Sequence, residues 1–187
     1  TGMAIHFRLD INELRPLGRT ARGVKSMNLR EGDNLVSMDV LTSDLVDQLA
    51  KIQDNNKEFD DNLEANSSEG PWVLIASAFG LGKRVPVTQF RLQKRAGMGL
   101  RAIKFRINDD VLVCLKVLGE GEELLFVTEK GVIVRTNADK ISQQSRAATG
   151  VKLQRLDEGD HLSEVVLVPR EQIEDIGEID QINLEKE

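Results

Sequence analysis

The chain repeats one pattern of two arginines and a glycine three times. The copies have the same internal spacing and are Arg8, Arg19 and Gly23; Arg84, Arg95 and Gly99; and Arg135, Arg146 and Gly150. The second and third copies are 51 residues apart, and the first interval is longer because of a polar, acidic stretch at residues 44–71. A period of this size, built from short apolar runs, is typical of propellers and solenoids. The chain therefore has to be interpreted unit by unit.

The last unit shows most clearly the order of strands expected in each repeat unit. Four short runs rich in β-branched and other apolar residues are separated by turn signals such as Gly131, which predicts four strands. We expect them at residues 124–128, 131–136, 151–156 and 162–168. The middle unit repeats them at residues 72–76, 83–87, 100–107 and 111–117. These two units predict complete four-stranded blades.

The first unit predicts an incomplete blade. Residues 4–40 align without gaps on residues 131–167, so this unit lacks its first strand. Because repeat units bury their apolar faces against neighbours, we expect the chain to be part of a longer protein. The prediction is an all-β, propeller-like repeat of four-stranded blades, a partial array of about three. The expected segments are 1–43 for the end of a blade, 44–71 for an acidic insertion, 72–121 and 122–170 for complete blades, and 171–187 for an acidic tail.

Charge is distributed unevenly along the chain. The net charge is −6, yet residues 44–71 and residues 171–187 each carry −6, which leaves +6 on the predicted blades. A basic body with acidic appendages points toward a nucleic-acid partner. We expect the two acidic segments to compete with DNA phosphates for the basic surface.

Basic residues recur at corresponding places in the three units. The candidates for contact with duplex DNA are Arg19, Arg22, Lys25, Lys94, Arg95, Arg101, Lys104, Arg106, Arg146 and Lys152. Alternation in residues 102–107 places Ile103, Phe105 and Ile107 on one face and the two bases on the other. Each base taken alone is compatible with an ordinary solvated position, but recurrence favours a track that contacts phosphates without reading bases. Aromatic residues make up only 4% of the chain, which disfavours single-strand binding by base stacking.

The repeated residues themselves have structural interpretations. Gly23, Gly99 and Gly150 are expected at the start of each third strand, where φ is positive or a neighbouring backbone lies close. Arg8, Arg84 and Arg135 stand at the ends of hairpin strands, and bracing one blade against the next is as good an interpretation of them as DNA binding.

Several motifs resemble the C-terminal domain of the A subunit of bacterial DNA gyrase and its close relative in topoisomerase IV. The residues that carry the resemblance are 18–24 (GRTARGV), 29–33 (LREGD), 82–85 (GKRV), 94–99 (KRAGMG), 127–135 (VTEKGVIVR) and 145–152 (SRAATGVK). The resemblance implies a β-pinwheel of six blades that exchange strands with their neighbours, with a basic rim that wraps duplex DNA.

The resemblance also implies a parent protein, a cytoplasmic type IIA topoisomerase that introduces negative supercoils with ATP. Its partners would be double-stranded DNA, its own N-terminal cleavage domain and the ATPase B subunit, in an A2B2 assembly. ATP and Mg²⁺ are implied for that holoenzyme only, and no cofactor is expected in this part of it. We expect no membrane association, since no apolar run approaches the roughly 20 residues that span a bilayer.

The family's diagnostic box reads Gln-Arg-Arg-Gly-Gly-Arg/Lys-Gly and lies in the first blade. Residues 93–99 (QKRAGMG) are similar to it but depart at Ala96, where the box has Gly, and at Met98, where it has a base. We interpret them as the equivalent connection in a later blade. The topoisomerase IV domain therefore stays an alternative to the gyrase domain, and a protein-binding propeller is the alternative from another class.

No catalytic or metal site is expected in the chain itself. A type II topoisomerase cleaves DNA with a tyrosine nucleophile, and this chain contains no tyrosine. His6 and His161 lack neighbouring ligands, and Asp33, Asp110 and Asp160 stand in turns that lack the staggered ligands of a calcium loop. Residues 80–83 are too short for a phosphate-binding loop and predict a hairpin turn. The single cysteine, Cys114, allows no intrachain disulfide.

One helix is expected outside the blades. Leu45, Leu49 and Ile52 have helical spacing, with Asp44 placed to cap the first turn, so residues 43–52 predict a short amphipathic helix that packs on a blade edge. We expect disorder at residues 54–68 and a flexible or loosely docked tail.

Overall fold

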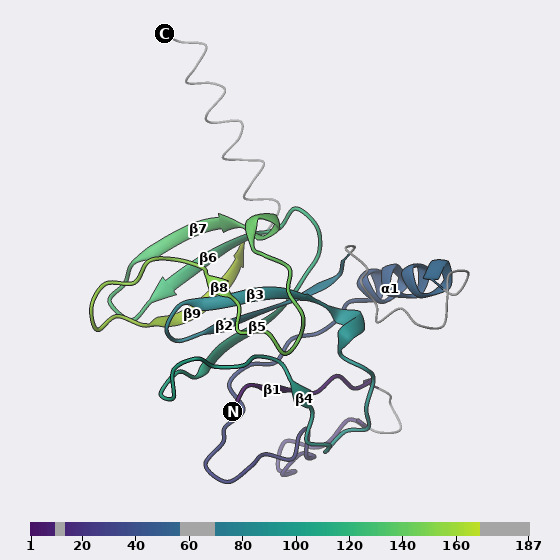
Figure 1. The fold of residues 1–187 in the computed structure, drawn as a ribbon. Helices are drawn as coiled ribbons and strands as arrows, with labels where there is room; N and C mark the ends of the chain where they lie inside the picture. The colour runs from purple at the N-terminus through teal and green to yellow at the C-terminus, as the bar shows by residue number, and fades with distance from the viewer. Residues whose placement is uncertain (10–13, 57–69, 169–187) are drawn as a thin grey trace, which may run out of the picture.

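The computed structural model describes residues 1–9, 14–56 and 70–168. The elements are the strands β1 (Met3–Ala4), β2 (Trp72–Ser77), β3 (Leu81–Pro86), β4 (Leu100–Arg101), β5 (Leu112–Leu118), β6 (Glu123–Thr128), β7 (Ile133–Asn137), β8 (Val151–Lys152) and β9 (Leu162–Val168), the helix α1 (Ser43–Asn56), and the 3-10 turns η1 (Val87–Gln89) and η2 (Ala138–Lys140). Figure 1 shows three small sheets that follow one another in chain order, with α1 to one side. The all-β prediction is confirmed, and α1 is the one α-helix in the described part of the chain.

The middle sheet has four strands, but one of them comes from the next unit. Its order is β5-β2-β3-β8, and β8 pairs with β3 through Leu81↔Lys152 and Gly82↔Val151. The middle unit's own third strand, β4, pairs instead with β1 of the first unit. The last unit keeps the order β7-β6-β9. The third expected strand of the last unit therefore lies in the sheet of the middle unit, and the strand exchange implied by the resemblance is confirmed.

The exchanged strands are much shorter than the sequence predicted. We expected strands at residues 100–107 and 151–156, and the ladders cover two residues in each case. Ile103 is buried at 2% exposure, but Ile107 is 49% exposed, so the predicted alternation ends before it. The ladder of β8 ends beside the turn that precedes Leu81, where β3 begins.

The first unit contains the least regular structure. Beyond β1 the described residues 14–42 form no strand, although residues 35–41 align with β9. This segment covers the edge of β5 with side chains, since Ser37 Oγ donates to Leu115 O at 2.9 Å and Asp39 Oδ2 accepts from Val117 N at 2.9 Å. Leu35, Met38 and Val40 remain exposed.

Strand β2 organises the core. All six of its residues are buried, and alternate residues face opposite ways. Leu74 and Ala76 belong to a cluster that includes Phe126 of β6, whereas Val73 and Ile75 belong to a second cluster on the side of the first unit. The continuous apolar run at 72–76 therefore forms a central strand that is covered on both faces. Continuous apolar runs of this length are typical of such strands. Cys114 lies in the first cluster, where burial raises the pKa of its thiol to about 11.

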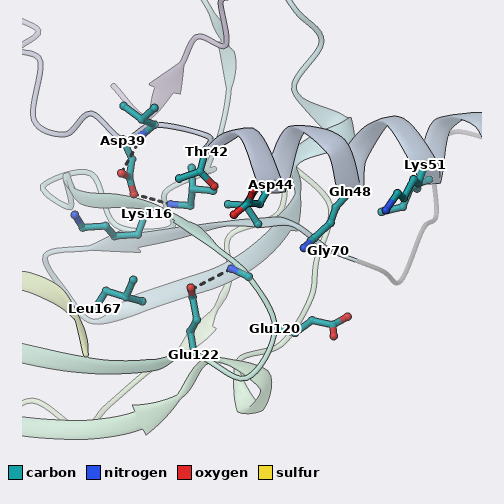
Figure 2. Close-up of a pocket in the computed structure, with 15 residues that line it drawn as sticks. Asp39, Thr42, Asp44, Gln48, Lys51, Gly70, Lys116, Glu120, Glu122 and Leu167 are labelled. Carbon is teal, nitrogen blue, oxygen red and sulfur yellow. Dashed lines mark hydrogen bonds between the residues drawn. The ribbon is translucent and has the colours of Figure 1, made fainter. Parts of the chain in front are cut away.

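The predicted helix is confirmed and runs four residues further, to Asn56. It begins with the Val46 N–H bonded to Thr42 O at 3.0 Å, and Leu49 packs against the second core cluster. Figure 2 shows a groove beneath α1 lined by Asp39, Asp44, Lys51, Lys116, Glu120 and Glu122 among others. Acids outnumber bases there, so the groove does not favour DNA phosphates. The expectation of disorder at residues 54–68 was wrong for residues 54–56, which belong to α1. Residues 57–68 and the tail at 171–187 lie outside the described residues.

The difference in strand pairing between the first and last units predicts a difference in hydrogen exchange of their backbone amides. Amides of residues 35–38 have no ladder to protect them, so they exchange with solvent far faster than amides of β6 and β9. Hydrogen–deuterium exchange read by mass spectrometry measures this. Slow exchange at 35–38 that disappears on dilution would mean that a second molecule pairs with this segment. Slow exchange at every concentration would contradict the pairing described here.

Candidate nucleic-acid interface

One arginine of the repeat joins each connection to the preceding unit, and it does so in the same way at both junctions. Arg95 Nη1 donates to Lys25 O at 2.7 Å, and Arg146 Nη1 donates to Arg101 O at 2.5 Å. Lys25 and Arg101 stand at corresponding positions of their units, two residues after the repeat glycine. Both guanidinium groups are thus partly used in joining blades, which explains why Arg95 and Arg146 are half-buried.

Backbone hydrogen bonds complete these junctions. Ala96 N donates to Ser26 O at 2.8 Å and Asn28 N donates to Gly97 O at 2.9 Å. At the next junction Lys104 N donates to Ala148 O at 3.2 Å. The stretches joined at the two junctions are residues 25–28, 94–97, 101–104 and 145–152, here together named the basic rim.

Seven of the ten predicted DNA-contacting residues lie in the basic rim. They are Lys25, Lys94, Arg95, Arg101, Lys104, Arg146 and Lys152. All but the two arginines of the junctions are exposed. Arg19, Arg22 and Arg106 are also exposed but lie outside the bonded stretches. Most of the predicted set therefore lies in the stretches that form the two junctions, and contact of each side chain with DNA stays a prediction.

The repeat glycines have the role that the sequence indicated. Gly99 has φ 75° and Gly150 has φ 97°, values that side chains rarely adopt. A Cβ on Gly150 would stand 2.6 Å from Gly82 O, and one on Gly99 would stand 2.5 Å from Ala4 O. The third strands of the middle and last units can therefore start only after a glycine that lies against the neighbouring backbone. Gly23 also has a positive φ of 76°, but no atom lies within 4 Å of the place that a Cβ would take. Ala96 carries a Cβ at φ 63°, a strained conformation that its N–H bond to Ser26 helps to hold.

Arg84 is a brace between blades. Its Nε donates to Ile141 O at 2.9 Å, its Nη1 forms an ion pair with Asp139 Oδ1 at 2.9 Å, and its guanidinium lies over the Trp72 ring with Cζ 4.8 Å from the centroid. Trp72 Nε1 in turn donates to Gln143 Oε1 at 2.9 Å. The bracing interpretation is confirmed for Arg84. Arg135 instead pairs with Glu123 inside its own hairpin.

The first unit corrects the alignment of the repeat. Ladder partners make Met3 equivalent to Leu81, and His6 equivalent to Arg84. His6 Nδ1 lies 2.9 Å from Phe90 O, which matches the bond from Arg84 to Ile141. Aligning Arg8 with Arg84 was therefore wrong, because the first connection is two residues longer and an alignment without gaps hides this.

Lys83 is the residue that sequence reasoning missed. It is fully buried, and its Nζ donates to the carbonyls of Ser145, Arg146 and Ala148 at 2.8, 2.6 and 2.7 Å. Burial lowers the pKa of Lys83 to about 8, and the charge of Arg146 acts in the same direction. Burying an ammonium costs several kcal/mol, and hydrogen bonds to a charged group offset about 1.5–3 kcal/mol each. The available signal was a lysine at a position where the last unit has Val134.

The turn aspartates act as hydrogen-bond acceptors. Asp110 Oδ1 accepts from Phe79 N at 3.1 Å and Val111 N at 2.9 Å, and Asp160 Oδ1 accepts from Lys130 N and His161 N at 3.1 and 2.9 Å. The two carboxylates therefore accept backbone hydrogen bonds at turns, as the sequence indicated. Within residues 1–9, 14–56 and 70–168, no group of three potential ligands could hold a metal ion, and no helix is long and apolar enough to cross a membrane.

Comparison with known proteins gives consistent results. A family model described as "DNA gyrase C-terminal domain, beta-propeller" matches residues 7–42, 71–116 and 122–169. The chain is 48% identical over 96% of its length to the DNA gyrase A subunit of Synechocystis sp., and 36% identical over 91% of its length to the DNA gyrase A subunit of Staphylococcus epidermidis. It spans only 22% and 16% of these two relatives. A solved gyrase A C-terminal domain is similar with a TM-score of 0.50 and 30% identity, covering 55% of this chain and 35% of that one.

The brace makes a prediction about stability. Arg84→Lys keeps the charge but loses the fork of donors and the stacking on Trp72, so the free energy of unfolding falls by about 1–3 kcal/mol. Arg135→Lys is the matched control, because its ion pair lies within one hairpin, and it changes stability by less than about 1 kcal/mol. Urea denaturation measures both. Equal losses would show that Arg84 is no brace.

The buried lysine makes a prediction about pH. Its pKa in the folded protein, about 8, is below the ordinary value of 10.5, so between these pH values the unfolded chain binds the proton that the folded chain has released. As the pH rises through this range, the free energy of unfolding of the wild type therefore rises relative to that of Lys83→Met, by up to about 3 kcal/mol in total. Denaturant titrations of both proteins from pH 7 to 10.5 test this. A constant difference would mean that Lys83 has an ordinary pKa.

Proposed function

Because this chain belongs to the family of DNA gyrase C-terminal domains, which are beta-propellers, we propose that its function is to bind duplex DNA along the basic rim and to bend it. The observation that carries the proposal is the pair of repeated junctions. Each places a base-bearing connection against the residues that follow the repeat glycine of the preceding unit, so bases of two successive units lie at each junction.

Attraction to phosphates is the physical basis of the proposed binding. The exposed bases Lys25, Lys94, Arg101, Lys104 and Lys152 would replace counterions along the duplex, and the steps between units would impose the bend. Arg95 and Arg146 stay in the candidate set, and the guanidinium of each is bonded to a carbonyl of the preceding unit. Arg19, Arg22 and Arg106 extend the candidate set beyond the rim. Sequence would matter little, because phosphate contacts position a protein without reading bases.

The role in a larger protein is part of the same proposal. The relatives are whole gyrase A subunits, so this chain would serve ATP-dependent negative supercoiling as one section of such a protein, together with a cleavage domain and the B subunit in an A2B2 enzyme of the cytoplasm. ATP and Mg²⁺ would be bound elsewhere in that enzyme. Gyrase is preferred to topoisomerase IV because the Synechocystis and Staphylococcus relatives are gyrase A subunits. Trp72 is buried beneath Arg84 and offers no exposed anchor for a protein-binding propeller.

Charge reversal on the rim tests the proposal. Lys94 and Lys104 are exposed and brace nothing with their side chains, so Lys94→Glu with Lys104→Glu keeps the fold and removes two phosphate contacts. We expect duplex affinity to fall by at least about tenfold at 0.1 M salt and the salt slope to shrink by about 2. Fluorescence anisotropy with labelled duplexes measures both quantities.

The matched control reverses two exposed lysines outside the rim. Lys51→Glu with Lys140→Glu makes the same change in net charge on α1 and after β7, and we expect a much smaller loss of affinity. Equal losses in the two variants would mean that net charge, and not the rim, governs binding. Several unrelated duplexes of one length complete the test, and a strong preference for one of them would indicate base readout and contradict bending through phosphates.

A further inference from the structure

Burying the Lys83 ammonium costs free energy that an apolar side chain at this position would not cost. A fully buried lysine is rare unless it is paired, and the partners here are three carbonyl oxygens of the following unit. The equivalent residue in the first unit is Ile5, whose Cδ1 lies against Gly97 in the corresponding connection. An apolar side chain therefore suffices to pack one junction. The ammonium at the other junction does something that packing alone does not require.

The three carbonyls belong to one tight turn. Ala148 N donates to Ser145 O at 3.1 Å, and the same Ser145 O, together with Arg146 O and Ala148 O, faces Lys83 Nζ. Three converging carbonyl dipoles repel one another unless a cation lies between them. An ammonium has three donors in a compact group and so matches them one to one. Lys83 thereby fixes the shape of residues 145–148.

This turn is the part of the basic rim that the last unit contributes at the last junction. Arg146 lies within it, with its N bonded to Gln89 Oε1 at 2.8 Å and its Nη1 bonded to Arg101 O. Lys152 follows on β8, whose ladder with β3 begins next to Lys83. The charged group acting on Lys83 from the facing connection is the Arg146 guanidinium. The shape of the turn thus determines where two rim cations stand relative to Arg101 and Lys104.

We propose that Lys83 is a positioning residue for DNA binding, which holds residues 145–148 in the shape that places Arg146 and Lys152 on the basic rim. The proposal rests on the proposed function of the rim. Lys83 itself touches no DNA, because it is fully buried.

Substitution by an unbranched apolar residue tests the role. Lys83→Met keeps the packing and removes the cation, and we expect duplex affinity at 0.1 M salt to fall by about fivefold or more, with a salt slope smaller by about 1. Hydrogen exchange of residues 145–150 becomes faster in the same variant. Val85→Ala is the control, because Val85 is buried on the same strand and belongs to the second core cluster, and we expect it to lose stability while binding duplex as the wild type does.

A double substitution shows through which residues Lys83 acts. Lys83→Met and Lys152→Gln should together weaken binding by less than the product of their separate effects, since both remove the same rim contacts. Fully multiplicative effects would overturn the positioning role.

Chemical rescue separates the cation from the packing. Lys83→Ala removes the atoms of n-propylammonium, so that ion should restore duplex affinity in this variant, whereas tetramethylammonium at equal ionic strength, which cannot donate a hydrogen bond, should not. Should Lys83→Met fail to fold, Lys83→Arg replaces it, since a planar guanidinium cannot donate to three converging carbonyls, and weaker binding is again expected. Wild-type affinity in Lys83→Met, or in its replacement, would overturn the proposal.

The outcomes distinguish this proposal from the proposed function. If Lys83 variants bind normally while the Lys94 and Lys104 reversal abolishes binding, the rim binds DNA and Lys83 does not position it. If the wild type shows no affinity for duplexes that depends on the rim lysines, the proposed function itself is wrong.

Discussion

The exchange of third strands between units is the constraint on which the structure depends. β8 completes the sheet of β3, and β4 pairs with β1, so the first and middle units each pair with a strand from the following unit. An exchanged strand of two residues supplies few ladder hydrogen bonds, and the junction therefore needs other contacts. The glycines at 99 and 150 allow backbones to approach closely, and the arginines at 95 and 146 donate across the gap. The same contacts that join the blades also line up the cations.

Polar groups at the junctions are therefore structural and functional together. Arg84 stacks on Trp72 and binds the turn at Asp139, and Lys83 lies among three carbonyls on the opposite face of the same strand. Adjacent residues of a strand point to opposite faces, so β3 reaches two different parts of the following unit with two neighbouring cations. One brings stability through a planar fork of donors, and the other fixes the shape of a turn. Neither charge is available to DNA in the way that the exposed lysines are.

Much of the architecture was accessible from local patterns. The period of the arginines and glycines, the apolar runs, and the Gly-marked turns predicted the long strands β2, β5, β6 and β9 within one or two residues, because burial on one or both faces leaves a direct trace in the order of residues. The extent of the exchanged strands was not accessible, because a ladder ends where its partner ends. Residues 35–41, which align with β9, form no strand in the described part of the chain.

The sequence by itself determined the repeat, the all-β class, the positive φ of the glycines at 99 and 150, and the surplus of positive charge on the blades. Only the tertiary structure decided which unit completes which sheet, that His6 and not Arg8 corresponds to Arg84, and that Lys83 is buried. The physical reason is the range of the interactions. Periodicity and turn preference act between near neighbours, whereas the burial of a lysine is set by carbonyls that lie more than sixty residues away along the chain.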